Sequence, residues 1–118
     1  MSPRVVGGVA VLDVSGELDL YTSPKLKTAL EELLGGGHAR LIVNLSETTY
    51  MDSTALRVLT AARQQTQEAG GNLGLVYAQP SIDRLMTITG LKDLFSTFSS
   101  EAAALDAAKS WMSAPPKT

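Results

Sequence analysis

The strongest chemical signal in the sequence is the turn Tyr50-Met51-Asp52-Ser53-Thr54, which joins an apolar segment to a helical pattern. A serine at the start of a helix has two possible uses. As a helix cap, the Ser53 hydroxyl would accept a hydrogen bond from the N–H of Ala55 or Leu56, while Asp52 complemented the helix dipole. As a phosphoacceptor, the same hydroxyl would carry a phosphate towards the N–H groups and the positive end of the helix. The two roles are compatible, and the turn alone leaves both open.

Catalytic chemistry has few residues to draw on. Asp19 and Asp52 could form an acid/base pair or bind a magnesium ion, but Arg57 is the one obvious cation near them that could orient a substrate. A Ser-His-Asp triad would need His38, the single histidine, which the topology places at the opposite rim of the domain. Gly35-Gly36-Gly37 follows a helix and precedes no Gly-Lys-Ser/Thr, so it is a helix end and not a phosphate loop. We therefore predict that the protein is not an enzyme and holds no metal or cofactor.

The elements that must hold the turn in place follow from hydrophobic periodicity and from turn residues. Ser23 is expected to cap the first helix, with Pro24 in its first turn, and Ser99 or Ser100 to cap the last. The predicted strands are Val5-Val6, Val9–Val14, Arg40–Leu45, Leu73–Tyr77 and Leu94–Phe98, and the predicted helices begin near Ser23, Thr54, Ser81 and Ser100. The predicted inward side chains of the second helix are Ala55, Val58, Leu59, Ala62, Thr66 and Ala69. The last helix is expected to carry Ala103, Leu105, Ala108 and Trp111.

This alternation predicts an α/β fold: a single domain with a mainly parallel, mixed sheet of four to five strands and about four helices packed on it. We place the domain at residues 1–112 and a disordered tail at 113–118. Loops that leave the C-terminal ends of parallel strands gather at one rim, where binding sites form. The loops Ser15–Thr22 and Ser46–Ser53 both leave strands there. They should bring together Glu17, Asp19, Asp52, Ser53 and Thr54.

Composition limits the partners and the compartment. The 118 residues include 44% hydrophobic side chains, enough for a core, and the net charge of −2 with scattered basic residues argues against nucleic-acid binding. There is no cysteine, which excludes disulfides and thiolate chemistry and fits a reducing cytosol. The first residues lack a signal-peptide pattern, and no apolar stretch approaches the length of a membrane helix. We therefore predict a cytoplasmic protein that binds neither nucleic acid nor membranes.

A series of short motifs occurs in an order that resembles a known family. The motifs are Gly16–Asp19, Tyr21–Leu26, Leu41–Leu45, Tyr50–Thr54, Gly70-Gly71 and Ile88–Leu91. Together they resemble the bacterial anti-sigma factor antagonists of the STAS class, over essentially a whole domain from residue 5 to residue 110. The resemblance implies a STAS-like fold.

The resemblance also implies a mechanism, which is partner switching. The unphosphorylated antagonist binds an anti-sigma factor, which thereby releases its sigma factor. The anti-sigma factor is often also a serine kinase that uses Mg-ATP, belonging to the kinase, to phosphorylate the antagonist and break the complex; a phosphatase resets it. Ser53 would then be the phosphoacceptor, with Asp19 as its acidic neighbour. The partner-binding rim would consist of Glu17, Asp19, Thr22, Asp52, Thr54, Ala55 and Arg57.

Two positions depart from the family, which usually continues the turn with Gly-Leu-Gly where this chain has Ala55-Leu56-Arg57. Ala55 adds a methyl where a glycine would let a partner backbone approach. Arg57 lies four residues after Ser53 and could contact a partner, pair with Asp52, or reach a phosphate on Ser53. Two alternatives stay open: a STAS interaction module of a larger signalling or lipid-transport assembly that is not phosphorylated, and a weak nucleotide-binding protein that uses the acidic rim. The oligomeric state is left open as well.

Overall fold

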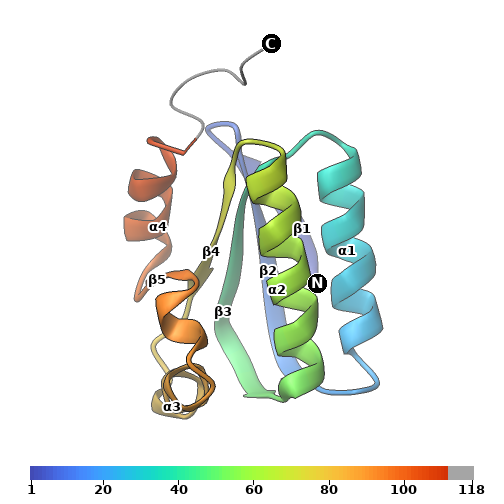
Figure 1. The fold of residues 1–118 in the computed structure, drawn as a ribbon, viewed down its shortest axis with the longest axis vertical. Coiled ribbons are helices and arrows are strands. Elements are labelled where there is room, and N and C mark those ends of the chain that lie inside the picture. Colours follow the sequence, from blue (N-terminus) through green and yellow to red (C-terminus); the bar gives the residue numbers. More distant parts are fainter. Residues whose placement is uncertain (112–118) are drawn as a thin grey trace.

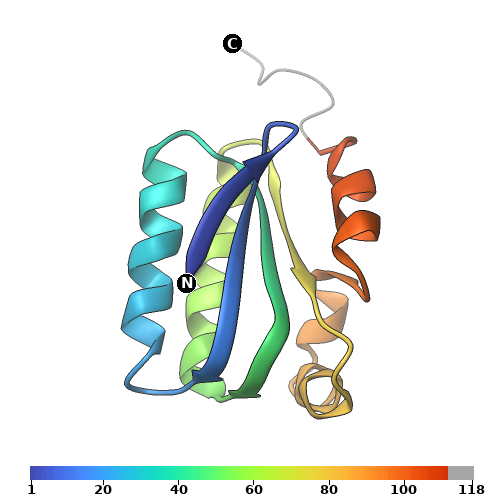
Figure 2. The same ribbon diagram turned by 180° about the vertical axis from the view of Figure 1, so that it is seen from behind.

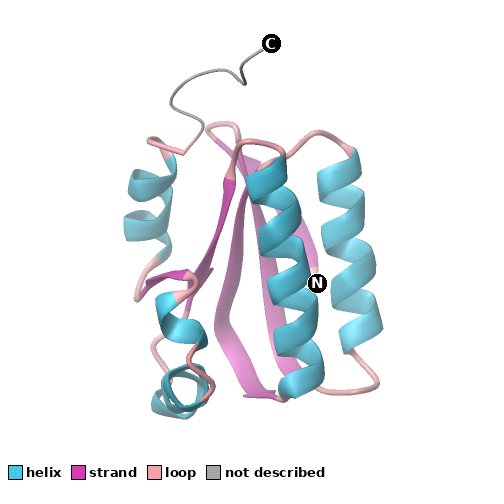
Figure 3. Ribbon diagram, viewed as in Figure 1, coloured by secondary structure: helices cyan, strands magenta, loops and turns pink. Residues whose placement is uncertain are grey.

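The computed structural model describes residues 1–111, and within them every predicted strand and helix is present (Figure 3). In chain order the elements are β1 (Ser2–Val6), β2 (Val9–Leu18), α1 (Ser23–Gly35), β3 (Arg40–Met51), α2 (Ser53–Glu68), β4 (Asn72–Val76), α3 (Pro80–Ile88), the 3-10 helix η1 (Leu91–Asp93), β5 (Ser96–Phe98) and α4 (Glu101–Ala108). The predicted tail at 113–118 lies outside the described residues. The predicted cap of the last helix is confirmed, because the Ser100 hydroxyl accepts the N–H of Ala103 at 3.2 Å.

The strands form one sheet in the order of the sequence, β1-β2-β3-β4-β5 (Figure 1). β1 and β2 are antiparallel and are joined by the Gly7-Gly8 turn, whereas the other neighbouring pairs are parallel. Parallel neighbours need a crossover connection, which α1, α2 and the α3–η1 segment provide. Each crossover returns the chain to the same end of the sheet. The C-terminal ends of β2 and β3 therefore lie together, at the lower edge in Figure 1.

Helices cover the two faces of the sheet unequally. α1 and α2 lie side by side on one face, over the larger buried cluster, to which Leu41 and Leu59 belong. α4 packs on the opposite face, over a smaller buried cluster that includes Ile42 and Ala108 (Figure 2). Neighbouring residues of one strand point to opposite faces, so β3 supplies both clusters through Leu41 and Ile42.

The inward stripes of the helices differ from the prediction by one or two residues. In α2 the buried side chains include Leu56, while Val58 is only half-buried and Ala69 is exposed beyond the helix end. In α4 the buried positions are 104 and 108, while Ala103 is exposed. These positions are four residues apart and face the sheet together. The start of each helix sets this phase, and periodicity locates a start only approximately.

Gly74 on β4 leaves room for the side chain of Trp111, which follows α4. A Cβ atom at this position would lie 2.8 Å from the ring of Trp111 and 3.1 Å from that of Phe98. Only a residue without a side chain leaves room for the indole there. Trp111 thus packs half-buried against the smaller cluster.

β2 and β3 are both longer than the sequence predicts. Residues 15–18 and 46–51, which were expected in loops, continue the parallel ladder, with Glu17 opposite Tyr50 and Leu18 opposite Met51. Two register shifts accommodate the extension, and at one of them Gly16 adopts φ +81°, a conformation that glycine adopts without strain. The sequence suggested loops in these two segments because their polar and apolar side chains do not alternate regularly. Their backbones pair nonetheless, since each strand meets the other along its full length.

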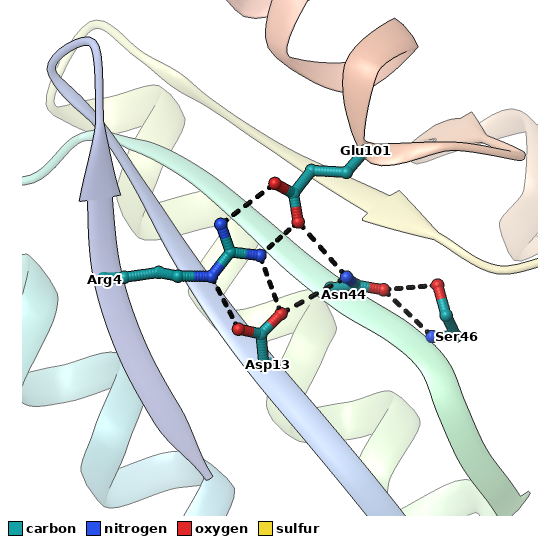
Figure 4. Close-up of polar contacts among 5 residues, drawn as sticks. All are labelled: Arg4, Asp13, Asn44, Ser46 and Glu101. Atoms are coloured by element: carbon teal, nitrogen blue, oxygen red, sulfur yellow. Dashed lines mark hydrogen bonds and ion pairs between the residues drawn. The ribbon is translucent and has the colours of Figure 1, made fainter.

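A polar cluster joins the N-terminal hairpin to α4 on the face opposite α1 and α2 (Figure 4). The Arg4 Nε and Nη2 donate to the two oxygens of Asp13 at 2.6 and 3.0 Å, and Nη1 donates to Glu101 Oε2 at 2.9 Å. Asn44 lies beside both carboxylates and donates to Asp13 Oδ1 at 3.2 Å and to Glu101 Oε1 at 3.3 Å. The Asn44 oxygen is held in turn by the Ser46 N–H at 3.0 Å. The cluster therefore connects β1, β2, β3 and the start of α4.

This cluster should make stability depend on pH. The Arg4 guanidinium lowers the pKa of the Asp13 carboxyl and of the Glu101 carboxyl. Groups with lowered pKa values contribute stability that is present above their ordinary pKa values and is lost as the pH falls. We expect Arg4→Gln to cost about 1 kcal/mol near pH 7, since the groups are partly exposed, and the difference to shrink below about pH 4.

Urea unfolding of wild type and Arg4→Gln at a series of pH values measures this difference. Arg84→Gln is the matched control, because Arg84 is exposed on α3 and has no ion pair among residues 1–111. A stability difference that stayed constant from neutral to acid pH would contradict the role of the carboxylates.

Candidate functional site

Asp52, and not Ser53, caps α2. The Asp52 backbone is extended (φ −113°, ψ −177°), and its Oδ1 accepts the N–H of Thr54 at 2.9 Å and that of Ala55 at 3.2 Å. The prediction that the Ser53 hydroxyl forms the cap is therefore wrong. The reason is tertiary: the Asp52 N–H donates to the Leu18 carbonyl at 3.1 Å. The β2–β3 ladder thus keeps residue 52 extended, and Asp52 takes the cap position directly before the helix.

Ser53 is the first residue of α2 and is exposed. Within residues 1–111 no hydrogen bond involves its hydroxyl, because Asp52 already satisfies the nearest helix amides. Neighbouring hydroxyls are less accessible. Thr54 is half-buried, and Thr48 is 1% exposed with its hydroxyl donating to the Val14 carbonyl at 3.0 Å. The start of α2 therefore presents an accessible serine that has no structural task of its own.

The loop between β2 and α1 is held by Asp19 and Thr22. The Asp19 Oδ1 accepts the backbone N–H of Tyr21 at 2.9 Å and that of Thr22 at 3.1 Å. In return, the Thr22 hydroxyl accepts the Asp19 N–H at 2.9 Å and donates to the Glu17 carbonyl at 2.8 Å. The N–H of Thr22, followed by that of Tyr21, lowers the pKa of the Asp19 carboxyl. Asp19 thus shapes the loop and adds a negative charge to it.

Ser23 does not cap α1, which corrects a second prediction. Thr22 occupies the cap position, and Ser23 is already the first helical residue. The Ser23 N–H donates to the Asp19 carbonyl at 2.8 Å, so the bonded loop fixes where the helix begins. The Ser23 hydroxyl itself is buried, and it has no hydrogen-bond partner in the described part of the chain.

The two residues that depart from the family sequence face opposite ways. Ala55 is 0% exposed and packs in the core, so the prediction that it belongs to the partner-binding rim is wrong. Arg57 is exposed, and it lines a groove of about 190 Å³ between α1 and α2 together with Lys27 and Glu31. No ion pair of Arg57 occurs among residues 1–111. Arg57 therefore remains available at the surface.

The remaining predicted residues come together at one edge of the sheet, at the bottom of Figure 1. The pairing of Leu18 with Met51 places the loop after β2 beside the start of α2. We call this edge the rim, and it consists of Glu17, Asp19, Thr22, Asp52, Ser53 and Thr54. The rim has a negative formal charge, which comes from the carboxylates of Glu17, Asp19 and Asp52. Arg57 lies one helical turn away from it.

Three large apolar side chains at the rim were missed by the sequence analysis. Leu20, Tyr21 and Tyr50 are 63%, 83% and 52% exposed. Leu20 and Tyr21 lie in the loop between β2 and α1, and Tyr50 lies opposite Glu17 in the ladder. These three residues form what we call the apolar patch. The sequence did contain one sign that they are exposed, because none of the three falls at an inward position of a predicted strand or helix.

Gln79 lies far from the rim in the sequence but supports the part of β3 that leads to it. β4 ends at Val76, whereas β3 continues to Met51 without that neighbour. The side-chain amide of Gln79 donates to the carbonyls of Leu45 and Thr48, at 2.7 Å each. One side chain thus replaces the missing strand and holds the extension of β3 in place.

Other site chemistries find little support in the described residues. His38 lies just before β3, at the end of that strand opposite Ser53. Among residues 1–111 no group of three or more His, Cys, Asp or Glu side chains is arranged to hold a metal ion. None of the described helices combines the length and the apolar character that a membrane span requires.

Comparison with known proteins places this geometry in a family. The STAS domain family model matches residues 1–104. The chain belongs to the STAS domain family. Over 81 residues this STAS domain is 40% identical to an anti-sigma-B factor antagonist of Staphylococcus epidermidis, a match that covers 69% of this chain and 75% of the relative. That identity and coverage confirm the predicted resemblance to the anti-sigma factor antagonists.

Solved structures share the fold. An anti-sigma factor antagonist from Mycobacterium paratuberculosis superposes on this STAS domain with a TM-score of 0.82 at 28% identity, over 92% of each chain. The Bacillus cell-fate determinant SpoIIAA in its phosphorylated form superposes with a TM-score of 0.70 at 18% identity, over 90% of this chain and 96% of SpoIIAA. The predicted STAS-like α/β fold is thereby confirmed.

The cap geometry predicts which substitution destabilises the STAS domain. Asp52→Ala removes the acceptor of two helix amides and should cost about 0.5–2 kcal/mol of unfolding free energy. Ser53→Ala should change it by less than about 0.5 kcal/mol, because the hydroxyl bonds nothing. Asp52→Asn is the matched control, since asparagine caps a helix about as well as aspartate. Urea unfolding of the three variants measures the differences, and a larger loss for Ser53→Ala than for Asp52→Ala would contradict the assignment of the cap.

Proposed function

We propose that this STAS domain is an anti-sigma factor antagonist that acts by partner switching in the cytoplasm. Unphosphorylated, it binds an anti-sigma factor that is also a serine kinase, and phosphorylation of Ser53 releases it until a phosphatase removes the phosphate. The observation that carries the proposal is the state of Ser53, which is exposed, unbonded and at the start of α2. The family membership and the 40% identical antagonist supply the partner class.

The geometry suits a residue that is modified and restored. A kinase must reach the acceptor hydroxyl, and Ser53 offers it without first breaking an internal hydrogen bond. Because Asp52 caps the helix, the modification leaves the cap bonds in place. A phosphate adds about −1.5 to −2 charges at pH 7, directly beside the Asp52 carboxylate. The fold can therefore remain intact while the surface presented to a partner changes.

The apolar patch supplies the binding energy in this proposal. Exposed tyrosines are over-represented among the residues that dominate protein–protein affinity. Tyr21 belongs to the loop that the Asp52–Leu18 hydrogen bond holds beside the start of α2, and Tyr50 lies three residues before Ser53 along the chain. A partner that covers this edge of the sheet would cover the serine as well. A phosphate under such a partner would have to lose its water and face a surface that is matched to a neutral hydroxyl, which is costly. Phosphorylation would therefore release the partner without any change of fold.

Ser53 should be the efficient phosphoacceptor. Incubation with the cognate anti-sigma factor kinase and ATP, followed by mass spectrometry, should place the phosphate on Ser53, and Ser53→Ala should abolish labelling. Thr54 is half-buried and Thr48 is bonded internally, so neither should compete. Phosphate found mainly on Thr54 or Thr49 would overturn the assignment. Val5→Ala, an exposed position in the N-terminal hairpin outside the rim, serves as a folding control in the same assay.

Partner affinity should depend on the charge at Ser53 and on the apolar patch. Calorimetry with the unphosphorylated anti-sigma factor should show at least tenfold weaker binding for Ser53→Asp, or about 1.4 kcal/mol, and a smaller loss for the uncharged Ser53→Asn. Tyr21→Ala should weaken binding by at least about tenfold as well. Val5→Ala is the control, because Val5 is an exposed apolar residue next to the Gly7-Gly8 turn, at the far end of the sheet. Unchanged dissociation constants for Ser53→Asp and Tyr21→Ala would contradict the proposed partner-binding surface.

A further inference from the structure

We infer that Arg57 grips the phosphate on Ser53, so that the modified side chain is held against the exposed face of α2. The inference rests on the proposed function only in that it takes Ser53 as the modified residue. It adds a positioning residue that the family sequence lacks, since the family usually has glycine where this chain has Arg57.

The start of α2 cannot by itself satisfy a phosphate. Of the first four helix amides, those of Thr54 and Ala55 bond to the Asp52 carboxylate, and that of Leu56 bonds to the Asp52 carbonyl at 3.2 Å. A phosphate on Ser53 therefore arrives where most donors are taken and where the Asp52 charge repels it. It needs a cation from elsewhere.

Arg57 is placed to be that cation. It lies four residues after Ser53, and residues at this spacing are neighbours on one face of a helix. An anion N-terminal to a cation is the favourable order along the helix. Both residues are exposed, and no ion pair engages Arg57 among residues 1–111. A guanidinium can donate two parallel hydrogen bonds to a phosphate, which a lysine cannot do.

The other charges near Arg57 do not replace it. Lys27 and Glu31 of α1 line the same groove, one of each sign, and Gln65 completes its polar lining. Lys27 lies on the neighbouring helix and not on the turn that follows Ser53. Glu31 is the carboxylate that would compete for the guanidinium, and a dianionic phosphate on the same helical face outcompetes a single carboxylate. The phosphate–Arg57 contact would also orient the phosphate towards α1.

The second ionisation of phosphoserine reports this contact directly. Phosphoserine is introduced at position 53 during synthesis, without a kinase, and its pKa near 6 is followed by phosphorus NMR. The guanidinium favours the dianion, so wild type should have a second acid dissociation constant about threefold larger than Arg57→Gln. Arg57→Lys should fall between them, because it keeps the charge and loses the planar fork. Arg84→Gln controls for the loss of one positive charge on another exposed helix position.

A thermal-unfolding cycle gives a second readout. Phosphorylation should raise Tm more in wild type than in Arg57→Gln, and subtracting the unmodified pair removes any effect of the substitution itself. Equal dissociation constants and equal Tm changes in the two proteins would overturn the inference. The proposed function fails separately, if the kinase leaves Ser53 unmodified, because phosphoserine is here introduced without a kinase.

Discussion

The parallel pairing of β2 with β3 continues past the point where the rest of the sheet has ended, and the rim depends on this extension. Leu18 lies opposite Met51, and the Asp52 N–H then bonds to the Leu18 carbonyl at 3.1 Å. This contact sets the last extended residue before α2 and, through it, the identity of the cap. Gln79 holds the other edge of β3 where β4 no longer reaches. A strand extension built from backbone hydrogen bonds thus decides which side chain of the turn is free.

The consequence is a separation of tasks between two adjacent residues. Asp52 accepts the N–H groups of Thr54 and Ala55. Ser53 is exposed, and its hydroxyl forms no hydrogen bond among residues 1–111. Had Ser53 been the cap, its modification would have disturbed the start of α2, because capping contributes of order 1 kcal/mol. With Asp52 in that role, a charge added at Ser53 acts on the surface and not on the core. Under the proposed function, the phosphorylation signal is therefore independent of the stability of the fold.

The two faces and the two ends of the sheet also have different roles. The larger core under α1 and α2 supports the rim from behind, while Arg4 and its carboxylate partners tie α4 to the hairpin on the opposite face. Those partners lie outside the rim, so the forces that close the domain do not compete with partner binding. The charge pattern follows the same division: the Arg4 guanidinium is matched by two carboxylates, whereas Arg57 is unmatched within residues 1–111.

The order of strands and helices, the parallel sheet, and the gathering of Asp19, Asp52 and Ser53 at one edge were all predictable from the sequence. These features depend on hydrophobic periodicity and on glycine and proline positions, which are local. The bounds of β2 and β3, the identity of both helix caps, and the inward direction of Ala55 were decided by tertiary structure. The strand bounds, the cap of α2 and the burial of Ala55 depend on contacts between segments distant in the sequence, such as that of Asp52 with Leu18, whereas the start of α1 depends on the hydrogen bonds of the Asp19–Thr22 loop. Hydrophobic periodicity and turn residues do not reveal such a contact. The sequence therefore located the turn, and the fold gave Asp52 and Ser53 their separate roles.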